Sequence, residues 1–202
     1  MKTEKDYIGD IAAIRNMMER SSKFLSLSGW AGVMAGIYAL AGAWLADRYF
    51  GYRPAALLDP AIEVPGALLL LALAILVLAL GTAILLSSRR AAARKEKIWN
   101  TTSQRMLLQM AIPLLSGGIL ALIFLSQGLN GALAPVTLLF YGLALVNAGS
   151  FTYRAIRLLG IIEIILALFA FYFVPYSMLC WALGFGLMHI LTGIYLHYTQ
   201  KR

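Results

Sequence analysis

The chain has 202 residues, of which 61% are hydrophobic and only 13% are charged, and its formal net charge is +8. Soluble domains usually contain about 45–50% apolar and about 25% charged residues, so this composition excludes a water-soluble globular domain. In a membrane protein a positive balance indicates Lys and Arg held in cytoplasmic loops, and we therefore expect no nucleic-acid binding.

Residues 1–23 are predicted to form a cytoplasmic amphipathic helix. Tyr7, Ile11, Ile14 and Met18 recur at intervals of about one helical turn, so they share one face. The apolar run that follows is too long for the core of a cleavable signal peptide, and we expect a retained anchor instead. The helix would lie on the membrane surface or, alternatively, dock a partner or a second copy of the chain.

Six apolar segments follow, with lengths near the roughly 20 residues that a helix needs to cross the hydrocarbon core of a bilayer. The sequence therefore predicts an all-α fold, a polytopic bundle of six transmembrane helices that forms one domain and is followed by a short tail. The predicted spans are residues 24–46, 64–86, 106–126, 132–148, 156–174 and 177–198, and the tail is 199–202.

Three local features are expected to shape these spans. Thr101 and Gln104 fit a capping box at the start of the third helix. Pro113 should kink that helix because it removes a backbone donor. Pro175 lies in the short turn between the fifth and sixth spans, so these two helices should be antiparallel neighbours.

The basic residues indicate the orientation of the bundle. Of the 17 Lys and Arg residues, all but Arg48 and Arg53 fall on one side of the predicted topology. Basic residues near the ends of transmembrane helices are retained on the cytoplasmic side. We therefore expect both termini to be cytoplasmic.

The entry into the first span, from Ile14 to Trp30, reads IRNMMERSSKFLSLSGW. This segment resembles the opening of a family of uncharacterised small multi-pass membrane proteins of bacteria. The resemblance implies a bacterial inner-membrane protein, and it brings no known activity and no functional residues.

Small residues recur along the first span. Ser28, Gly32 and Gly36 lie at i,i+4 steps, which places them on one helical face. Helices in lipid associate where small side chains let their backbones approach closely. The first span is therefore predicted to lie at the centre of the bundle or at a contact between subunits.

Two ionisable residues lie well inside predicted spans, Glu163 in the fifth and His189 in the sixth. Such residues are costly in a membrane and usually face the interior of the bundle. Their helical distances from the inner boundary are about 9 Å and about 12 Å at 1.5 Å per residue. We therefore predict that Glu163 and His189 meet across the hairpin, within about 6 Å of each other or through a bridging water.

Further polar residues are predicted at the same inner side of the membrane. Together with Glu163 and His189 they could line a small cavity open to the cytoplasm. Alternatively, each could satisfy a backbone carbonyl or a neighbouring helix, or could face the lipid headgroups. These residues are Ser26, Ser28, Thr82, Gln109 and Asn147.

The sequence contains no motif that identifies a reaction, a metal site or a phosphate site. His189 and His197 both fall on the last predicted span, so they could not ligate a haem from facing helices. Cys180 has no second cysteine with which to form an intrachain disulfide. We expect no cofactor and no metal.

Three functions stay open at this stage. The leading expectation is a non-enzymatic regulatory, sensory or assembly subunit that acts through a protein partner or as a homo-oligomer. The alternative is a small oligomeric transporter or channel that uses Glu163 and His189. The third is an intramembrane enzyme acting on a lipid or isoprenoid substrate, with the same two residues as acid and base.

Overall fold

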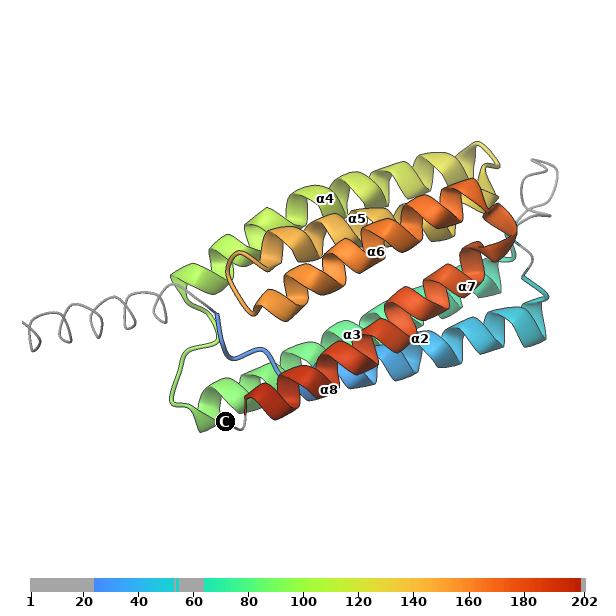
Figure 1. Ribbon diagram of the computed structural model, residues 1–202. Helices are drawn as coiled ribbons and strands as arrows, with labels where there is room; N and C mark the ends of the chain where they lie inside the picture. Colours follow the sequence, from blue (N-terminus) through green and yellow to red (C-terminus); the bar gives the residue numbers. More distant parts are fainter. Residues whose placement is uncertain (1–23, 53, 55–63, 201–202) are drawn as a thin grey trace, which may run out of the picture.

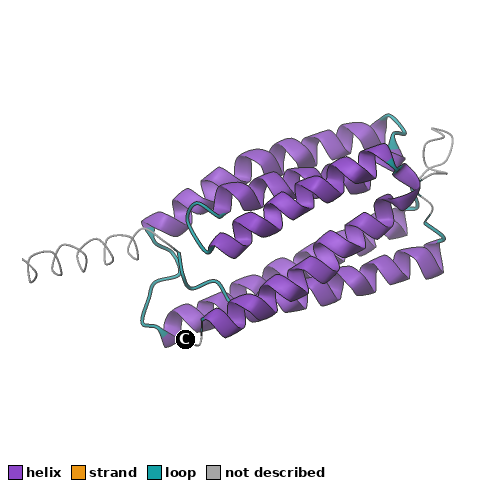
Figure 2. Ribbon diagram, viewed as in Figure 1, coloured by secondary structure: helices purple, strands orange, loops and turns teal. Residues whose placement is uncertain are grey.

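The computed structural model describes residues 24–52, 54 and 64–200, and every regular element within these ranges is a helix (Figures 1 and 2). The amphipathic helix predicted for residues 1–23 lies outside the described residues. Six helical segments are long and apolar enough to cross a membrane. The chain is thus a multi-pass membrane protein whose described part is all-helical.

The bounds of the elements follow the apolar segments. The last membrane-spanning segment, Val174–Thr199, is a continuous run of four shorter elements. The elements are α2 (Gly29–Phe50), α3 (Gly66–Ala93), α4 (Thr101–Ser126), the 3-10 turn η2 (Asn130–Ala132), α5 (Leu133–Ala148), α6 (Arg154–Tyr172), the 3-10 turn η3 (Val174–Tyr176), α7 (Ser177–Trp181), the π-helix η4 (Ala182–Met188) and α8 (His189–Thr199).

Three helix ends differ most from the sequence-based bounds. The first helix begins at Gly29, because residues 24–27 bond to other segments and Ser28, which is extended, accepts the first hydrogen bond of the helix from the Ala31 backbone N–H. Helix α3 continues to Ala93 and α4 begins at Thr101. Their extra turns carry Ala, Arg and Gln, which favour helix in water, whereas hydropathy marks only the part surrounded by lipid.

The capping box of α4 lies one residue earlier than predicted. The Ser103 backbone N–H donates to Asn100 Oδ1 at 2.9 Å, and the Asn100 backbone N–H donates to Ser103 Oγ at 2.9 Å. Asn is among the strongest N-cap residues and ranks above Thr, so the cap forms at Asn100. Thr101 is therefore the first residue of the helix, and the prediction of a box from Thr101 to Gln104 is wrong.

The helices form two layers of three (Figure 1). Helices α4, α5 and α6 make one layer with α5 in the middle, and α3, α2 and α8 make the other with α2 in the middle. Glycines permit the closest approaches within each layer. A Cβ added at Gly142 of α5 would lie 2.8 Å from the Gly160 carbonyl oxygen of α6, and one at Gly36 of α2 would lie 2.5 Å from the carbonyl oxygen of Gly186.

The last membrane-spanning segment crosses from one layer to the other. Its first part, α7, packs against α5 and α6, whereas η4 and α8 pack mainly against α2. The π-helix lies where the crossing occurs. Insertions of this kind within α-helices are uncommon and are frequent at functional sites.

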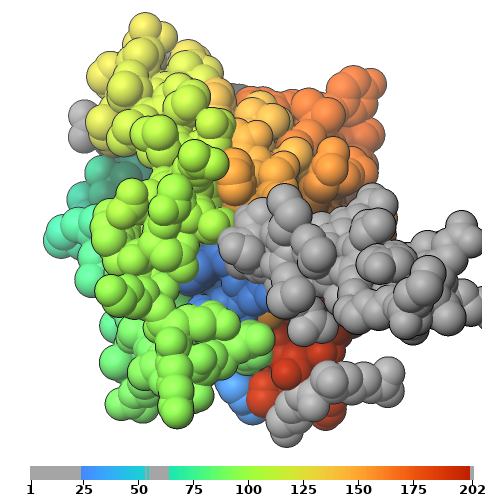
Figure 3. All heavy atoms as spheres, turned by 90° about the vertical axis from the view of Figure 1, so that its left-hand side faces the viewer, coloured from blue at the N-terminus to red at the C-terminus, as the bar shows by residue number. Residues whose placement is uncertain are grey.

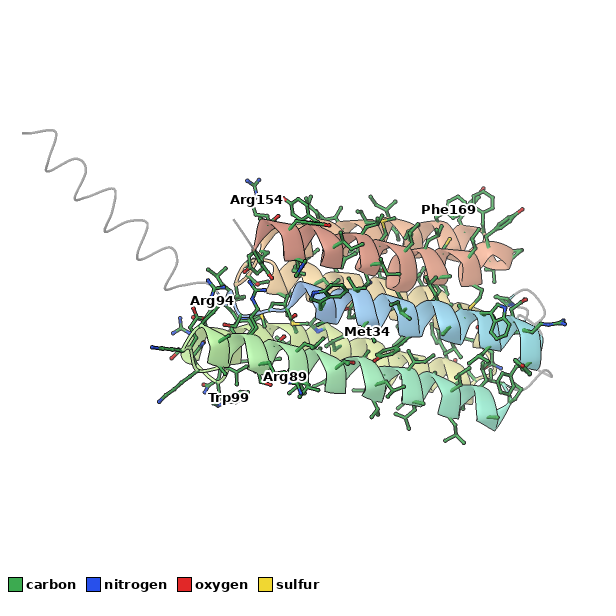
Figure 4. All side chains as sticks on the ribbon, turned by 90° about the horizontal axis from the view of Figure 1, so that it is seen from below. Met34, Arg89, Arg94, Trp99, Arg154 and Phe169 are labelled. Atoms are coloured by element: carbon green, nitrogen blue, oxygen red, sulfur yellow. The ribbon has the colours of Figure 1, made fainter. Side chains whose placement is uncertain are left out.

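One end of the bundle collects the basic side chains, and we call it the basic end. Figure 3 looks onto this end, where α2, α4 and α6 begin and α3, α5 and α8 finish. Arg89, Arg94, Trp99 and Arg154 lie toward it, and Phe169 lies toward the opposite end (Figure 4). The described basic residues thus follow the one-sided distribution expected from the sequence.

Candidate functional site

Glu163 is buried completely, although it lies on a membrane-spanning helix. Its exposed fraction is 0%. Gly142 of α5 and Gly184 of the π-helix leave it just enough room. A Cβ added at Gly142 would come 3.0 Å from Glu163 Cβ, and one added at Gly184 would collide with Glu163 Oε2. Gly184 therefore leaves room for the carboxyl group, and Gly142 leaves room for the base of the same side chain.

The carboxyl group faces His189, as the hairpin geometry predicts. Glu163 Oε1 lies 3.4 Å from His189 Nδ1, which is well within the 6 Å expected. The separation suits an ion pair, but the angles do not make a hydrogen bond. Neither oxygen of Glu163 has a hydrogen-bond partner among the described residues.

The imidazole of His189, in contrast, uses both ring nitrogens. Nδ1 lies 3.0 Å from the carbonyl oxygen of Gly184, and Nε2 lies 2.9 Å from the hydroxyl of Tyr141. Because a carbonyl oxygen can only accept, the proton on Nδ1 points at Gly184. A neutral ring would then accept a hydrogen bond from Tyr141 at Nε2, and a protonated ring would donate from both nitrogens.

The charge of the pair depends on one proton. When Glu163 and His189 share one titratable proton, either as carboxylic acid with imidazole or as carboxylate with imidazolium, the pair is neutral. Removing that proton leaves a net negative charge in surroundings where isolated charges are very costly. The pair therefore has the chemistry of a proton-binding site.

Two apolar clusters enclose this site, one toward each end of the bundle. The basic-end cluster contains Phe24, Met106, Leu145, Ala148, Ile156, Leu159 and Leu196, and Tyr141 and Met188 pack against it. The opposite-end cluster contains Leu138, Ala167, Ala170 and Cys180, and Trp181 and Phe185 pack against it. The ring of Phe185 also stacks on His189, with centroids 5.9 Å apart. Apolar side chains therefore pack on both sides of the site along the bundle.

The other polar residues singled out from the sequence do not join this site. Asn147 Nδ2 donates to the backbone oxygen of Gln109 at 3.1 Å. Thr82 bonds to the carbonyl of Leu78 in its own helix. Thr82 is on α3, in the other layer, and the side chain of Gln109 is exposed. Asn147 and Thr82 thus each bond to a backbone carbonyl, which was the alternative to lining a shared polar cavity.

The remaining predicted residues lie at the basic end. The backbone N–H of Ser28 lies 3.4 Å from Ser87 Oγ, its acceptor, and Ser26 Oγ donates to Glu96 Oε2 at 2.5 Å. Ser28 precedes α2 and does not extend the stripe of small residues within it. Gly32 does face the last span, since a Cβ there would lie 3.3 Å from the carbonyl oxygen of His189.

Two residues of the site were not identified from the sequence. Tyr141 lies in the middle of an apolar span, whereas tyrosines of membrane proteins favour the interfaces. That unusual depth was the available signal. Gly184 gave no comparable signal, because many glycines occur in these spans and a π-helix has no recognisable sequence pattern.

Glu163 and His189 would supply at most two ligands to a metal ion. Among the residues that the structure describes, no group of three or more His, Cys, Asp or Glu side chains is placed to hold one. No family model matches the chain, and no curated protein or solved structure matches it either.

Proposed function

We propose that this chain is a small membrane transporter or channel whose activity depends on the proton shared by Glu163 and His189. One observation carries the proposal: a carboxyl group with 0% exposure has no hydrogen-bond partner among the described residues. Leaving a buried acceptor unsatisfied costs about 1–3 kcal/mol, and more for a charged group. A leucine would avoid this cost, so a purely structural role explains the carboxyl group poorly.

The close packing around Glu163 favours the proton as the bound species in this conformation. Because a single added methyl group at Gly184 would collide with the carboxyl group, the closed site has no room for an acyl chain. This argues against the enzyme acting on a lipid substrate. Any larger cargo would have to enter after one end of the bundle opens.

Two helix contacts of the first half of the bundle recur in its second half. The first span packs against the second (α2 with α3), and the fourth packs against the fifth in the same way (α5 with α6). Likewise the third span packs against the fourth (α4 with α5), and the sixth packs against the first (α8 with α2). A shift of three spans reverses the direction of each helix, so these two recurring contacts are ones that an inverted repeat, as found in secondary transporters, would produce. The correspondence is incomplete, because α6 also packs against α7 while α3 and α4 make no comparable contact.

In this mechanism the last span couples release of the proton to movement of the two helical layers. Loss of the proton leaves the carboxylate of Glu163 unpaired, which weakens the packing of the π-helix against α6. Because α7 belongs to one layer and α8 to the other, a shift at the π-helix moves the layers relative to each other. Only one of the two apolar clusters needs to open at a time.

A flux assay tests the proposal. The purified protein would be reconstituted into liposomes with a pH-sensitive dye inside, and a potassium diffusion potential would drive protons inward. Glu163→Gln keeps the shape of the side chain but removes its titratable proton, so we expect at least a tenfold loss of flux. Asp47→Asn, a similar change at an exposed position of α2, is the matched control and should keep the flux of the parent. No flux with the parent protein, or full flux with Glu163→Gln, would contradict the proposal.

We also propose that the basic end faces the cytoplasm of a bacterium, with the chain in the inner membrane. The distribution of Lys and Arg supports this orientation. Alkaline phosphatase fused after Arg202 should be inactive, because this reporter folds only outside the cytoplasm. An active fusion would reverse the orientation.

A partner-dependent role is the second candidate, and α3 is the observation that favours it. Within the described chain α3 packs mainly on α2, and none of its most apolar 18-residue window is buried. This surface could face lipid, a second copy or a partner subunit. Cross-linking through a cysteine placed at Leu73, which is 56% exposed, should give a dimer in membranes. A strictly monomeric protein that retains no companion in mild detergent would contradict this candidate.

A further inference from the structure

Residues 24–28 form an extended strap that enters the basic end between the two layers (Figures 1 and 3). The strap bonds first to the connection between α5 and α6. The Phe24 backbone N–H donates to the Phe151 carbonyl oxygen at 2.6 Å, and Thr152 Oγ1 donates to the Phe24 carbonyl oxygen at 2.7 Å. The Tyr153 hydroxyl donates to the carbonyl oxygen of Leu25 at 2.8 Å. The strap is therefore fixed to the layer of α4, α5 and α6.

The same strap bonds to the other layer. Arg94, just after α3, donates from Nη1 to the Leu25 carbonyl oxygen at 3.1 Å, so Leu25 accepts from both layers. Gln200, just after α8, donates from Nε2 to the carbonyl oxygen of Leu27 at 2.9 Å. These bonds join segments that are far apart in the sequence. They tie the two layers together at the basic end.

The turn after α3 is shaped to reach the strap. Lys95 has a φ of 56°, and it is the only described residue other than glycine with a positive φ. This left-handed residue separates Arg94, which bonds to Leu25, from Glu96, which accepts a hydrogen bond from Ser26. The left-handed residue belongs to the end of α3 itself, because the Glu96 backbone N–H donates to the Ala91 carbonyl oxygen at 2.9 Å and the Lys95 backbone N–H donates to the Ala92 carbonyl oxygen at 3.0 Å. This is the Schellman arrangement that commonly ends a helix, and here it directs Arg94 and Glu96 to the strap.

The strap also covers the proton site. The side chain of Phe24 is only 6% exposed and lies in the basic-end cluster, among Leu145, Leu159 and Leu196. Tyr141, whose hydroxyl bonds to His189, packs against the same cluster. The side chain of Phe24 therefore belongs to the apolar packing that lies between the basic end and the site.

We propose that the strap of residues 24–28 is the gate that closes the proton site toward the basic end, and that releasing its bonds to Thr152 and Tyr153 opens that end. This inference rests on the proposed function for its biological meaning. Its physical content is independent: the strap controls access to the middle of the bundle. If the strap were only an anchor, loosening it would leave the interior as inaccessible as before.

Access can be measured with a reporter cysteine. The single native cysteine, Cys180, would be replaced by alanine, and Met188→Cys would place a thiol beside His189 and against the basic-end cluster. A membrane-impermeant cationic methanethiosulfonate would be added to vesicles of either orientation. Thr152→Val removes the hydroxyl that bonds to the strap and keeps the shape of the side chain. We expect it to raise the labelling rate from the basic end at least fivefold, with no change from the opposite end.

Two controls keep the result specific. Thr152→Ser retains the hydroxyl and should label within twofold of the parent. Thr199→Val removes a hydroxyl that bonds only within α8, to Tyr195, and should also label within twofold of the parent. If Thr152→Val fails to fold, Tyr153→Phe removes the second bond to the strap and should give the same increase.

Equal labelling rates for the parent and the strap variants would overturn the gate. A labelling rate that increases from both ends would also overturn it, because that result indicates general loosening of the bundle. The flux assay on Glu163→Gln is a separate readout. Loss of flux with unchanged labelling would reject the gate alone. Increased labelling with normal flux in Glu163→Gln would reject the proton site alone.

Discussion

Two carboxylates of this chain have opposite surroundings. Glu96, at the basic end, accepts a hydrogen bond from Ser26, and its Oε1 lies 3.6 Å from Arg94 Nε. The side chain of Glu96 is 44% exposed. Glu163, in the middle of the bundle, is fully buried and is compensated only by His189 at 3.4 Å. The well-partnered group holds the strap in place. The poorly partnered group lies where a change of one proton changes the local charge.

This difference suggests that stability and function are separated along the bundle. Polar groups at the basic end form many bonds between distant segments, so changes there should affect closure. Polar groups around Glu163 fit tightly but bond poorly, so changes there should affect both packing and proton binding. Three substitutions test the comparison, beginning with the largest expected effect.

Gly184→Ala should be the most damaging single change in the site. The added methyl group would collide with Glu163 and would lie 2.7 Å from Leu138 Cδ2. Overpacking of a tight core typically costs about 1–3 kcal/mol, and we expect the upper part of that range. The loss would appear as a lower melting temperature of the protein in detergent.

Gly81→Ala is the matched control for this change, because a Cβ at Gly81 of α3 meets nothing within 4 Å. Alanine favours helix over glycine by up to about 1 kcal/mol, so this variant should be as stable as the parent or more stable. Equal stability of Gly184→Ala and the parent would mean that the carboxyl group is not packed as described.

Glu163→Met should stabilise the protein while abolishing its flux. Methionine has a similar length and no branch, so it should fit between Gly142 and Gly184. Replacing a buried, poorly compensated ionisable group by an apolar side chain of similar volume is often neutral or stabilising by about 1–4 kcal/mol. Thermal unfolding followed by tryptophan fluorescence measures the change.

Glu96→Met is the comparison at the basic end. Because Glu96 is bonded and partly exposed, the same replacement there should be neutral or destabilising. A destabilised Glu163→Met protein would show that the carboxyl group stabilises the bundle, and the contrast between the two sites would be lost.

Lys95→Gly should have the smallest effect, a stabilisation of about 0.5–1 kcal/mol. A left-handed conformation costs a residue with a Cβ roughly 1–2 kcal/mol, part of which glycine loses again through its greater freedom in the unfolded chain. Lys97→Gly removes the same charge at a position without a positive φ, and it should be neutral or destabilising. Equal melting temperatures for the two variants would remove the argument that the turn at Lys95 is strained.

Hydropathy was sufficient to predict much of the fold. Long uncharged runs can only be helices in lipid, because a helix satisfies its own backbone hydrogen bonds. The contact of Glu163 with His189 was also predictable, since a tight turn fixes the pairing of neighbouring helices and helical rise fixes the depths. Both inferences needed only residues that are close together in the sequence.

The sequence by itself determined that this protein is a helical bundle with six segments able to span a membrane and an ionisable pair in its last hairpin. Only the tertiary structure decided that residues 24–28 form an extended strap, that the last span crosses between layers at a π-helix, and that Tyr141 completes the site. Hydropathy and helical periodicity describe how a segment meets its solvent. The strap and the crossing depend instead on hydrogen bonds and glycine contacts between segments up to 173 residues apart, which become definite only when the helices pack.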